Sequence, residues 1–114
     1  MNQGESEKRD PPSAARTFER FADFYPFYLG EHRNATCRRL HFVGSWGVIA
    51  FLVTFALTGD GWWLLAAIVC GYAFAWVGHF FFEKNRPATF RHPIYSLMGD
   101  WVMFRDICVG RIKL

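Results

Sequence analysis

The chain has 114 residues, of which 52% are hydrophobic and 19% aromatic, and its formal net charge is +3. This length allows one domain, and 13 Phe and 5 Trp are more than the core of so small a soluble protein needs, so we expect part of the apolar surface to face lipid. Lys and Arg flank the apolar stretches, which is the charge pattern of a membrane protein and argues against nucleic acid as a partner.

The N-terminal part of the chain predicts a tail followed by an amphipathic helix. Residues 1–14 are polar and charged, so we expect a disordered tail ahead of a single membrane domain at residues 15–114. Thr17 is a plausible cap for a helix that Pro26 should bend or end. Such a helix suits either the membrane interface or packing against spanning helices. Its aromatic face comprises Phe18, Phe21, Tyr25 and Tyr28.

Two apolar runs, at about residues 41–58 and 61–83, are long enough to cross a bilayer as helices. The turn residues Thr58-Gly59-Asp60-Gly61 between them predict an antiparallel hairpin. From Ile94 to Cys108, apolar residues recur at helical spacing but charged residues interrupt them, which predicts a third, amphipathic helix packed beneath the hairpin. The predicted fold class is therefore all-α: an integral membrane helical hairpin flanked by an N-terminal and a C-terminal amphipathic helix.

Two histidines are placed symmetrically about the turn. His41 lies 19 residues before Asp60 and His79 lies 19 residues after it, so both should sit roughly 28 Å from the turn, at one depth. The positive-inside rule places this histidine level and both termini on the cytoplasmic face, of the inner membrane in a bacterium or of the endoplasmic reticulum in a eukaryote. The cations at that end are Arg33, Arg38, Arg39, Lys84, Arg86 and Arg91.

The histidine level is a candidate metal site. His41, His79 and the carboxylate of Glu83, one turn after His79, suit ferrous iron with open coordination positions. If His41 and His79 share an ion, their imidazoles should approach within about 5 Å. For any one of the four histidines taken alone, hydrogen bonding at the membrane interface is the more common role.

His32 needs a break in the helix to reach the same site. On one straight helix it would point away from His41, because nine residues turn the helix by about 180°. A break at Gly30 and Glu31 would allow it to join. His92, just before Pro93, suits a surface position at the start of a new helix or a fold back to the site. The cysteines have no CxxC spacing and are expected to be reduced, packed thiols: Cys37, Cys70 and Cys108.

The polar loop after Glu83 carries cations on the histidine side of the hairpin. Arg86 and Arg91 are candidates for neutralising a substrate carboxylate or an anionic headgroup. Ordinary solvated charge beside a membrane span is the alternative.

Four stretches of the chain resemble a known family. They are FYLGEH (27–32), RLHFVG (39–44), GYAFAWVGHFFFEKNRPATF (71–90) and PIYSL (93–97). Through them, the sequence from about residue 17 to 112 is similar to the bacterial branch of the Mpo-type 2-hydroxy fatty acid dioxygenase family, once catalogued as a domain of unknown function.

The resemblance implies an enzyme. The resemblance implies that the yeast member of the family is an enzyme of the endoplasmic reticulum membrane. That enzyme uses Fe(II) and O2 to shorten a 2-hydroxy fatty acid by one carbon, in α-oxidation. The implied iron ligands are His32, His41 and His79, and Glu83 falls on the family's acidic position. Glu83 would either bind the metal or accept a hydrogen bond from a ligating imidazole.

The sequence therefore predicts an integral membrane, Fe(II)-dependent dioxygenase acting on a lipid-derived 2-hydroxy fatty acid. Two other classes of protein fit the same pattern. His41 and His79 could clamp a haem between them in an electron carrier. Alternatively, the chain could be a non-catalytic membrane scaffold whose histidines only form hydrogen bonds.

Overall fold

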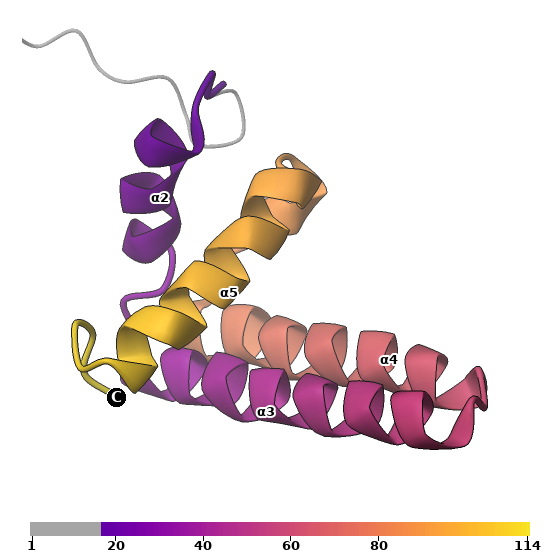
Figure 1. Cartoon of the computed structure of the whole chain (residues 1–114). Helices are drawn as coiled ribbons and strands as arrows, with labels where there is room; N and C mark the ends of the chain where they lie inside the picture. The colour runs from indigo at the N-terminus through magenta and orange to yellow at the C-terminus, as the bar shows by residue number, and fades with distance from the viewer. Residues whose placement is uncertain (1–16) are drawn as a thin grey trace, which may run out of the picture.

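The computed structural model describes residues 17–114, and this part of the chain is helical, without strands (Figure 1). The all-α fold class predicted from the sequence is confirmed. The expected disordered tail, residues 1–14, lies outside the described residues. The elements are α2 (Phe21–Gly30), α3 (Ala35–Thr58), α4 (Trp62–Val77), the π-helix η2 (Gly78–Glu83), the short 3-10 helix η3 (Ala88–Phe90) and α5 (Pro93–Cys108).

Helix α3 and the continuous α4–η2 segment form the expected antiparallel hairpin, seen side by side in Figure 1. They are 24 and 22 residues long and apolar enough to cross a membrane by length and composition. Helix α3 begins at Ala35, six residues before the predicted span, because Asn34 caps it: its side-chain oxygen accepts hydrogen bonds from the backbone N–H groups of Thr36 and Cys37.

The hairpin turn has the chemistry expected from its sequence. Gly59 adopts the left-handed conformation, with φ of 70°, which glycine tolerates best, and its N–H bonds to the carbonyl of Phe55 to close α3. The Asp60 carboxylate then accepts a 3.0 Å hydrogen bond from the backbone N–H of Trp62, at the start of α4. These bonds satisfy backbone groups that a helix end otherwise leaves without partners.

The N-terminal helix departs from the prediction at both ends. Helix α2 begins at Phe21, so Thr17 does not cap it, and it continues past Pro26 to Gly30. Pro26 is the sixth of the ten residues of α2, and its missing N–H leaves the carbonyl of Ala22 without its helical donor. The helix packs against α5 and η3, and not against the spanning helices as one of the two expectations had it. Its fully buried residues, Phe24 and Tyr28, join a core cluster with residues of α5 and η3.

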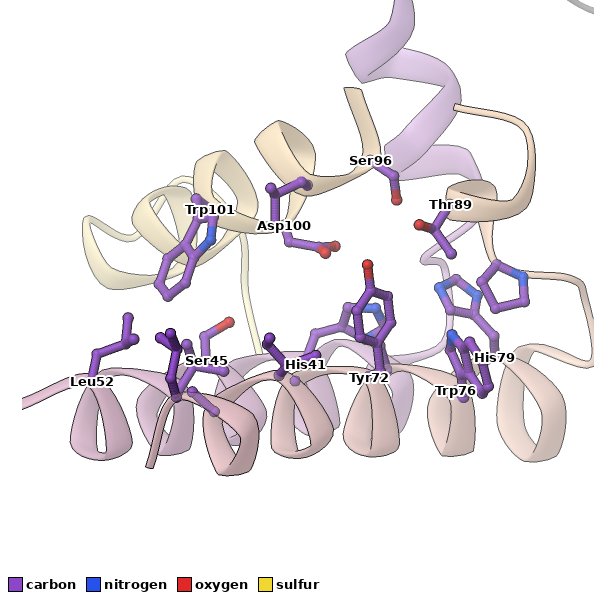
Figure 2. Close-up of a pocket in the computed structure, with 18 residues that line it drawn as sticks. His41, Ser45, Leu52, Tyr72, Trp76, His79, Thr89, Ser96, Asp100 and Trp101 are labelled. Carbon is purple, nitrogen blue, oxygen red and sulfur yellow. The ribbon is translucent and has the colours of Figure 1, made fainter. Parts of the chain in front are cut away.

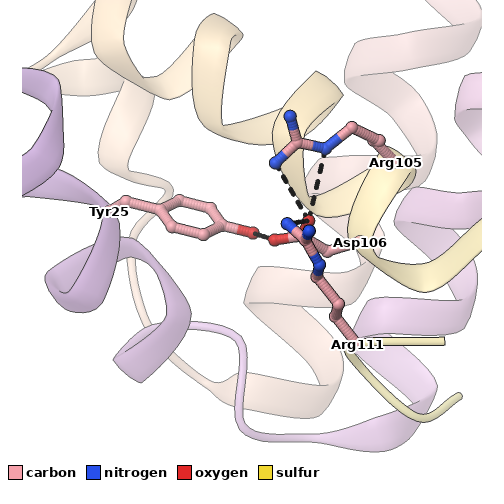
Figure 3. Close-up of polar contacts among 4 residues, drawn as sticks. All are labelled: Tyr25, Arg105, Asp106 and Arg111. Carbon is pink, nitrogen blue, oxygen red and sulfur yellow. Dashed lines mark hydrogen bonds and ion pairs between the residues drawn. The ribbon is translucent and has the colours of Figure 1, made fainter. Parts of the chain in front are cut away.

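Helix α5 has the predicted start and end and slants across the end of the hairpin opposite the turn, with α2 standing beside it (Figure 1). Two hydrogen bonds tie α2 to α5. Tyr25 donates to Asp106 over 2.8 Å, and Tyr28 donates to Asp100. Asp106 also pairs with two arginines (Figure 3), at 3.1 Å from Arg105 and 3.7 Å from Arg111.

Close packing of the hairpin depends on glycine at position 44. A Cβ atom there would lie only 2.7 Å from the Cβ of Phe74, on the facing helix. We expect Gly44→Ala to destabilise the fold by about 1–3 kcal/mol, because Phe74 or the helix backbone has to move. Thermal unfolding in detergent, followed by circular dichroism, measures the change.

Gly61→Ala is the matched control. The same added methyl group meets no atom within 4 Å at this position, so its melting temperature should stay close to that of the wild type. Equal melting temperatures for the wild type and Gly44→Ala would contradict the close approach of α3 and α4.

Candidate metal centre

Three buried imidazoles meet where the α2–α3 turn, α3 and η2 converge. His32 comes from the turn, His41 from α3 and His79 from η2, and their exposed fractions are 2%, 6% and 3%. The ring centroid of His32 lies 4.5 Å from that of His41 and 4.5 Å from that of His79. The centroids of His41 and His79 are 5.0 Å apart, which confirms the approach expected from their equal depth.

His32 reaches this cluster because the helix breaks where the sequence required it. Helix α2 ends at Gly30, and Glu31 is the residue that caps it. Residues 32 and 33, outside any helix, then lead to Asn34, which caps α3. The break removes the constraint of a single helix, on which His32 and His41 would point to opposite sides.

The segment that carries His79 is π-helical. In a π-helix, as in an α-helix, residues four apart lie roughly one turn apart, so His79 and Glu83 stay near the same side of the segment. The segment also lies close against α3, since a Cβ atom on Gly78 would be 2.9 Å from the sulfur of Cys37. The Glu83 side chain nevertheless turns to the backbone of Asn34.

Glu83 caps a helix in this structure. Its carboxylate is half-buried and accepts a 2.5 Å hydrogen bond from the backbone N–H of Asn34, where a negative charge favours the N-terminus of α3. Glu83 is not among the side chains whose donor atoms gather around the three imidazoles. Metal ligation by Glu83 stays a prediction.

The hydrogen bonds of His32 and His41 define which ring nitrogen carries the proton. The Nδ1 atom of His32 lies 2.6 Å from the carbonyl oxygen of Tyr28, and that of His41 lies 2.9 Å from the carbonyl oxygen of Cys37. A carbonyl oxygen only accepts hydrogen bonds, so both Nδ1 atoms must be donors. The Nε2 atoms of the neutral rings then carry free lone pairs.

The same reasoning applies to His79 through Asn85. The amide nitrogen of Asn85 donates to the carbonyl oxygen of Glu31 and to its carboxylate, at 3.1 and 3.0 Å. The amide oxygen is thereby turned toward the Nδ1 atom of His79, at 2.7 Å, and accepts its proton. All three imidazoles consequently present Nε2 as the unprotonated atom.

This donor set fits a metal ion. The Nε2 atoms of His32 and His41 are 3.1 Å apart, and with no proton between them two lone pairs at this distance repel unless a cation lies beside them. Two nitrogens bound to one ion at about 2.0–2.1 Å and at right angles would lie about 3 Å apart. A ring N–H donated to a carbonyl or amide oxygen is also the usual arrangement behind a metal-binding histidine.

The environment of His32 keeps its ring neutral, as metal binding requires. Burial lowers the pKa of His32 well below its usual value, and the neighbouring His41 and His79 lower it further. A neutral imidazole retains the lone pair that binds a metal.

Cys37 and Asn85 were missed in the sequence analysis. Cys37 is a packed thiol as expected, but its sulfur lies 3.7 Å from the Nδ1 atom of His41, and one donor atom from each of Cys37 and the three histidines lies within 4.8 Å of the others. The spacing of four residues between Cys37 and His41 was a usable signal. No spacing rule pointed to Asn85, because the chain leaves the π-helix before reaching it.

The remaining predicted residues lie apart from the three imidazoles. Arg86 and Arg91 are exposed, and the Arg86 guanidinium stacks 5.2 Å from the ring centre of Phe90. A role for either arginine with a substrate carboxylate stays a prediction. His92 is half-buried against the rings of Phe18 and Phe24 and does not fold back to the cluster.

A cavity of about 460 Å³ opens from the cluster, with His41 and His79 in its wall (Figure 2). It follows the hairpin as far as Leu64, which is fifteen residues, or about 22 Å of helix, from His79. Its apolar part lies toward the hairpin turn. Thr89 and Ser96 lie near His79, Tyr72 and Asp100 lie nearer the middle, and Ser45 lies between His41 and Leu52 (Figure 2). The cavity therefore suits an elongated ligand with one polar end.

The fold and the cluster define a helical hairpin protein with a buried candidate metal centre, and a comparison with protein families gives this class a name. A family model described as 2-hydroxy-palmitic acid dioxygenase Mpo1-like matches residues 18–112. The chain belongs to this family, which confirms the resemblance noted in its sequence. No curated protein and no solved structure gives a significant match.

Asp100 should make the stability of the fold depend on pH. Burial raises its pKa from 3.8 to about 7, although the hydrogen bond from Tyr28 acts in the opposite direction. The folded state therefore holds the proton more tightly than the unfolded state, and stability should fall as the pH rises from about 4 through 7. Asp100→Asn should abolish this fall. The melting temperature of Asp100→Asn minus that of wild type should therefore be larger at pH 8 than at pH 5.

Asp106→Asn is the contrasting control, measured in metal-free protein. Hydrogen bonds from Tyr25 and Arg105 hold the pKa of Asp106 below its usual value despite its burial. Its stabilising contribution is present above the unfolded pKa, so Asp106→Asn should lower the melting temperature at pH 5 and at pH 8 alike. If the difference in melting temperature between wild type and Asp100→Asn is the same at pH 5 and at pH 8, the raised pKa of Asp100 is refuted.

Proposed function

We propose that this chain is an integral membrane, Fe(II)-dependent dioxygenase that uses O2 to shorten 2-hydroxy fatty acids by one carbon. The observation that carries the proposal is the set of three unprotonated Nε2 atoms, since two of the three histidines, His41 and His79, line an elongated and largely apolar cavity. The family description supports the reaction class, because it names a dioxygenase of a 2-hydroxy fatty acid.

His32, His41 and His79 would hold the iron, which supplies the one-electron and O2 chemistry of the reaction. The hydrogen bonds at the three Nδ1 atoms fix the ring orientations and keep the lone pairs on Nε2. Burial of the rings excludes water from the reacting end of the substrate. Glu83 would contribute indirectly, by holding the start of the helix that carries His41.

The substrate would bind with its carboxylate and 2-hydroxyl group at the histidine end of the cavity. Its acyl chain would lie along the apolar wall between the hairpin and α5, which includes Val48, Leu52, Leu64 and Ile68. This orientation follows from matching the polar end of the ligand to the polar end of the cavity.

Membrane integration is proposed from the surface of the hairpin. Large apolar side chains of α3 and α4 are exposed on the outside, including Leu57 at 82% and Trp62 at 74%. Such a surface is costly in water and suits lipid. The cations near the histidine end support a cytoplasmic location for that end and for both termini.

The geometry favours a non-haem site over a haem clamp. A clamped haem needs two imidazoles on opposite faces of a planar macrocycle. Here three rings pack directly against one another, with centroids 4.5–5.0 Å apart and ring planes 76–88° to each other. The unprotonated nitrogens likewise favour a metal centre over a scaffold with purely structural histidines.

Replacing a histidine tests the function. His79→Ala removes one proposed ligand, so iron binding should weaken by far more than the 10- to 100-fold typical of a change behind the ligands, and turnover should disappear. We would measure iron by metal analysis of detergent-purified protein. Turnover would be followed, with Fe(II) and O2, by mass spectrometry of the acid one carbon shorter than the long-chain 2-hydroxy fatty acid supplied.

His92→Ala is the matched control, since His92 lies outside the cluster and this variant should keep its iron. Glu83→Gln should fall within the milder 10- to 100-fold range if Glu83 acts indirectly. Full iron and turnover in His79→Ala would refute the ligand assignment. If iron-loaded wild type gives no shortened acid at any chain length, the proposed reaction is wrong.

Thiol labelling tests the topology. A cysteine replacing Asp60, at the hairpin turn, should react with a membrane-impermeant reagent added to intact cells, because the turn is expected outside. Cys108, exposed near the C-terminus, should react only after lysis and serves as the internal control. Peptide mapping separates the two positions, and the reverse pattern would overturn the proposed orientation.

A further inference from the structure

Two tyrosine–aspartate pairs join α2 to α5, and they differ in whether arginines neutralise the charge of the carboxylate. Asp106, which bonds to Tyr25, also pairs with Arg105 and Arg111 (Figure 3). Among the described residues, Tyr28 is the only hydrogen-bond partner of the Asp100 carboxylate, and no cation pairs with it. A half-buried carboxylate without a cation costs stability, so the structural link alone does not account for Asp100.

Asp100 faces the cavity of the proposed active site. Figure 2 shows its carboxylate directed into the space between α5 and the hairpin, on the side where the hydroxyl of Tyr72 also points. Among the described residues, it is the one acidic side chain in the cavity wall, and no Lys or Arg lines that wall. One carboxylate oxygen is held by Tyr28, which leaves the other available to a ligand.

A carboxylate with free acceptor capacity favours a ligand that brings a hydrogen-bond donor. Asp100 is charged above its pKa of about 7, so at pH 8 it would repel a second carboxylate, and the cavity wall offers that carboxylate no cation except an ion held by the histidines. A 2-hydroxy acid carries both groups on adjacent atoms. Its carboxylate can therefore lie at the histidine end while its hydroxyl turns toward α5.

Resting on the function proposed above, we propose that Asp100 is a specificity-determining residue, which accepts a hydrogen bond from the 2-hydroxyl group of the bound substrate. It thereby selects 2-hydroxy fatty acids over plain fatty acids of the same length. Tyr28 fixes the acceptor, and it also ties the acceptor to the metal centre. Its ring stacks on His32, with centroids 4.0 Å apart, and its carbonyl receives the Nδ1 proton of that histidine.

Ligand binding under nitrogen separates this inference from turnover. The full-length wild-type protein, loaded with Fe(II), would be titrated with 2-hydroxyhexadecanoic acid and with hexadecanoic acid. The fluorescence of Trp76 and Trp101, both in the cavity wall, reports binding. The measured quantity is the ratio of the two dissociation constants, plain acid to hydroxy acid.

Asp100→Asn should lower this ratio by about tenfold or more, the usual contribution of a hydrogen bond to a charged group. The asparagine oxygen would stay with the Tyr28 hydroxyl, so the amide nitrogen would face the cavity. It can donate only a neutral hydrogen bond to the substrate hydroxyl, and the stronger bond to a charged acceptor is lost. Asp106→Asn, the same change on the same helix outside the cavity, should leave the ratio unchanged.

A second ligand keeps the test decisive even if Asp100→Asn does not fold, as judged by circular dichroism. 2-Methoxyhexadecanoic acid keeps the oxygen but lacks the donor, so wild type should bind it about as weakly as the plain acid. Equal binding of the methoxy and hydroxy acids, or an unchanged ratio in Asp100→Asn, overturns the role of Asp100 and leaves the proposed function standing. If wild type binds neither the hydroxy nor the plain acid, both the inference and the proposed substrate class fall.

Discussion

The site depends on three hydrogen bonds from histidine Nδ1 atoms to oxygens that can only accept. The carbonyls of Tyr28 and Cys37 and the amide oxygen of Asn85 hold the protons on one side of the rings, so the lone pairs of all three Nε2 atoms remain free. Each acceptor comes from a different part of the fold: the end of α2, the first turn of α3 and the loop after η2. The donor set therefore exists only when these three segments are assembled.

Helix α5 completes the molecule in two ways. Through Tyr25 and Asp106 it fixes α2 in place with a carboxylate that two arginines neutralise. Through Asp100 it adds a polar side chain to a cavity that the hairpin alone would leave open on one side. The two aspartates lie on one helix and each has a tyrosine partner. Only Asp106, which two arginines neutralise, has the environment of a purely structural carboxylate.

Helix irregularities place the histidines. The break after Gly30 lets His32 turn back toward His41, and the π-helical segment carries His79 while directing Glu83 to the N-terminus of α3. Glycine at position 78 allows this segment to lie against Cys37. A regular helix at any of these points would move one imidazole away from the other two.

The sequence by itself determined the hairpin, its turn, the extent of α5 and the equal depth of His41 and His79, because these follow from apolar run length, turn residues and the constant rise of a helix. It also identified His32 as a conditional member of the cluster. The start of α2, the capping role of Glu83 and the exposure of Arg86 and Arg91 were decided by tertiary structure. So were the contributions of Asn85 and Asp100, since their partners lie on segments distant in the chain and no local periodicity records which side chains meet. Cys37 is different, because its spacing of four residues from His41 was a local signal.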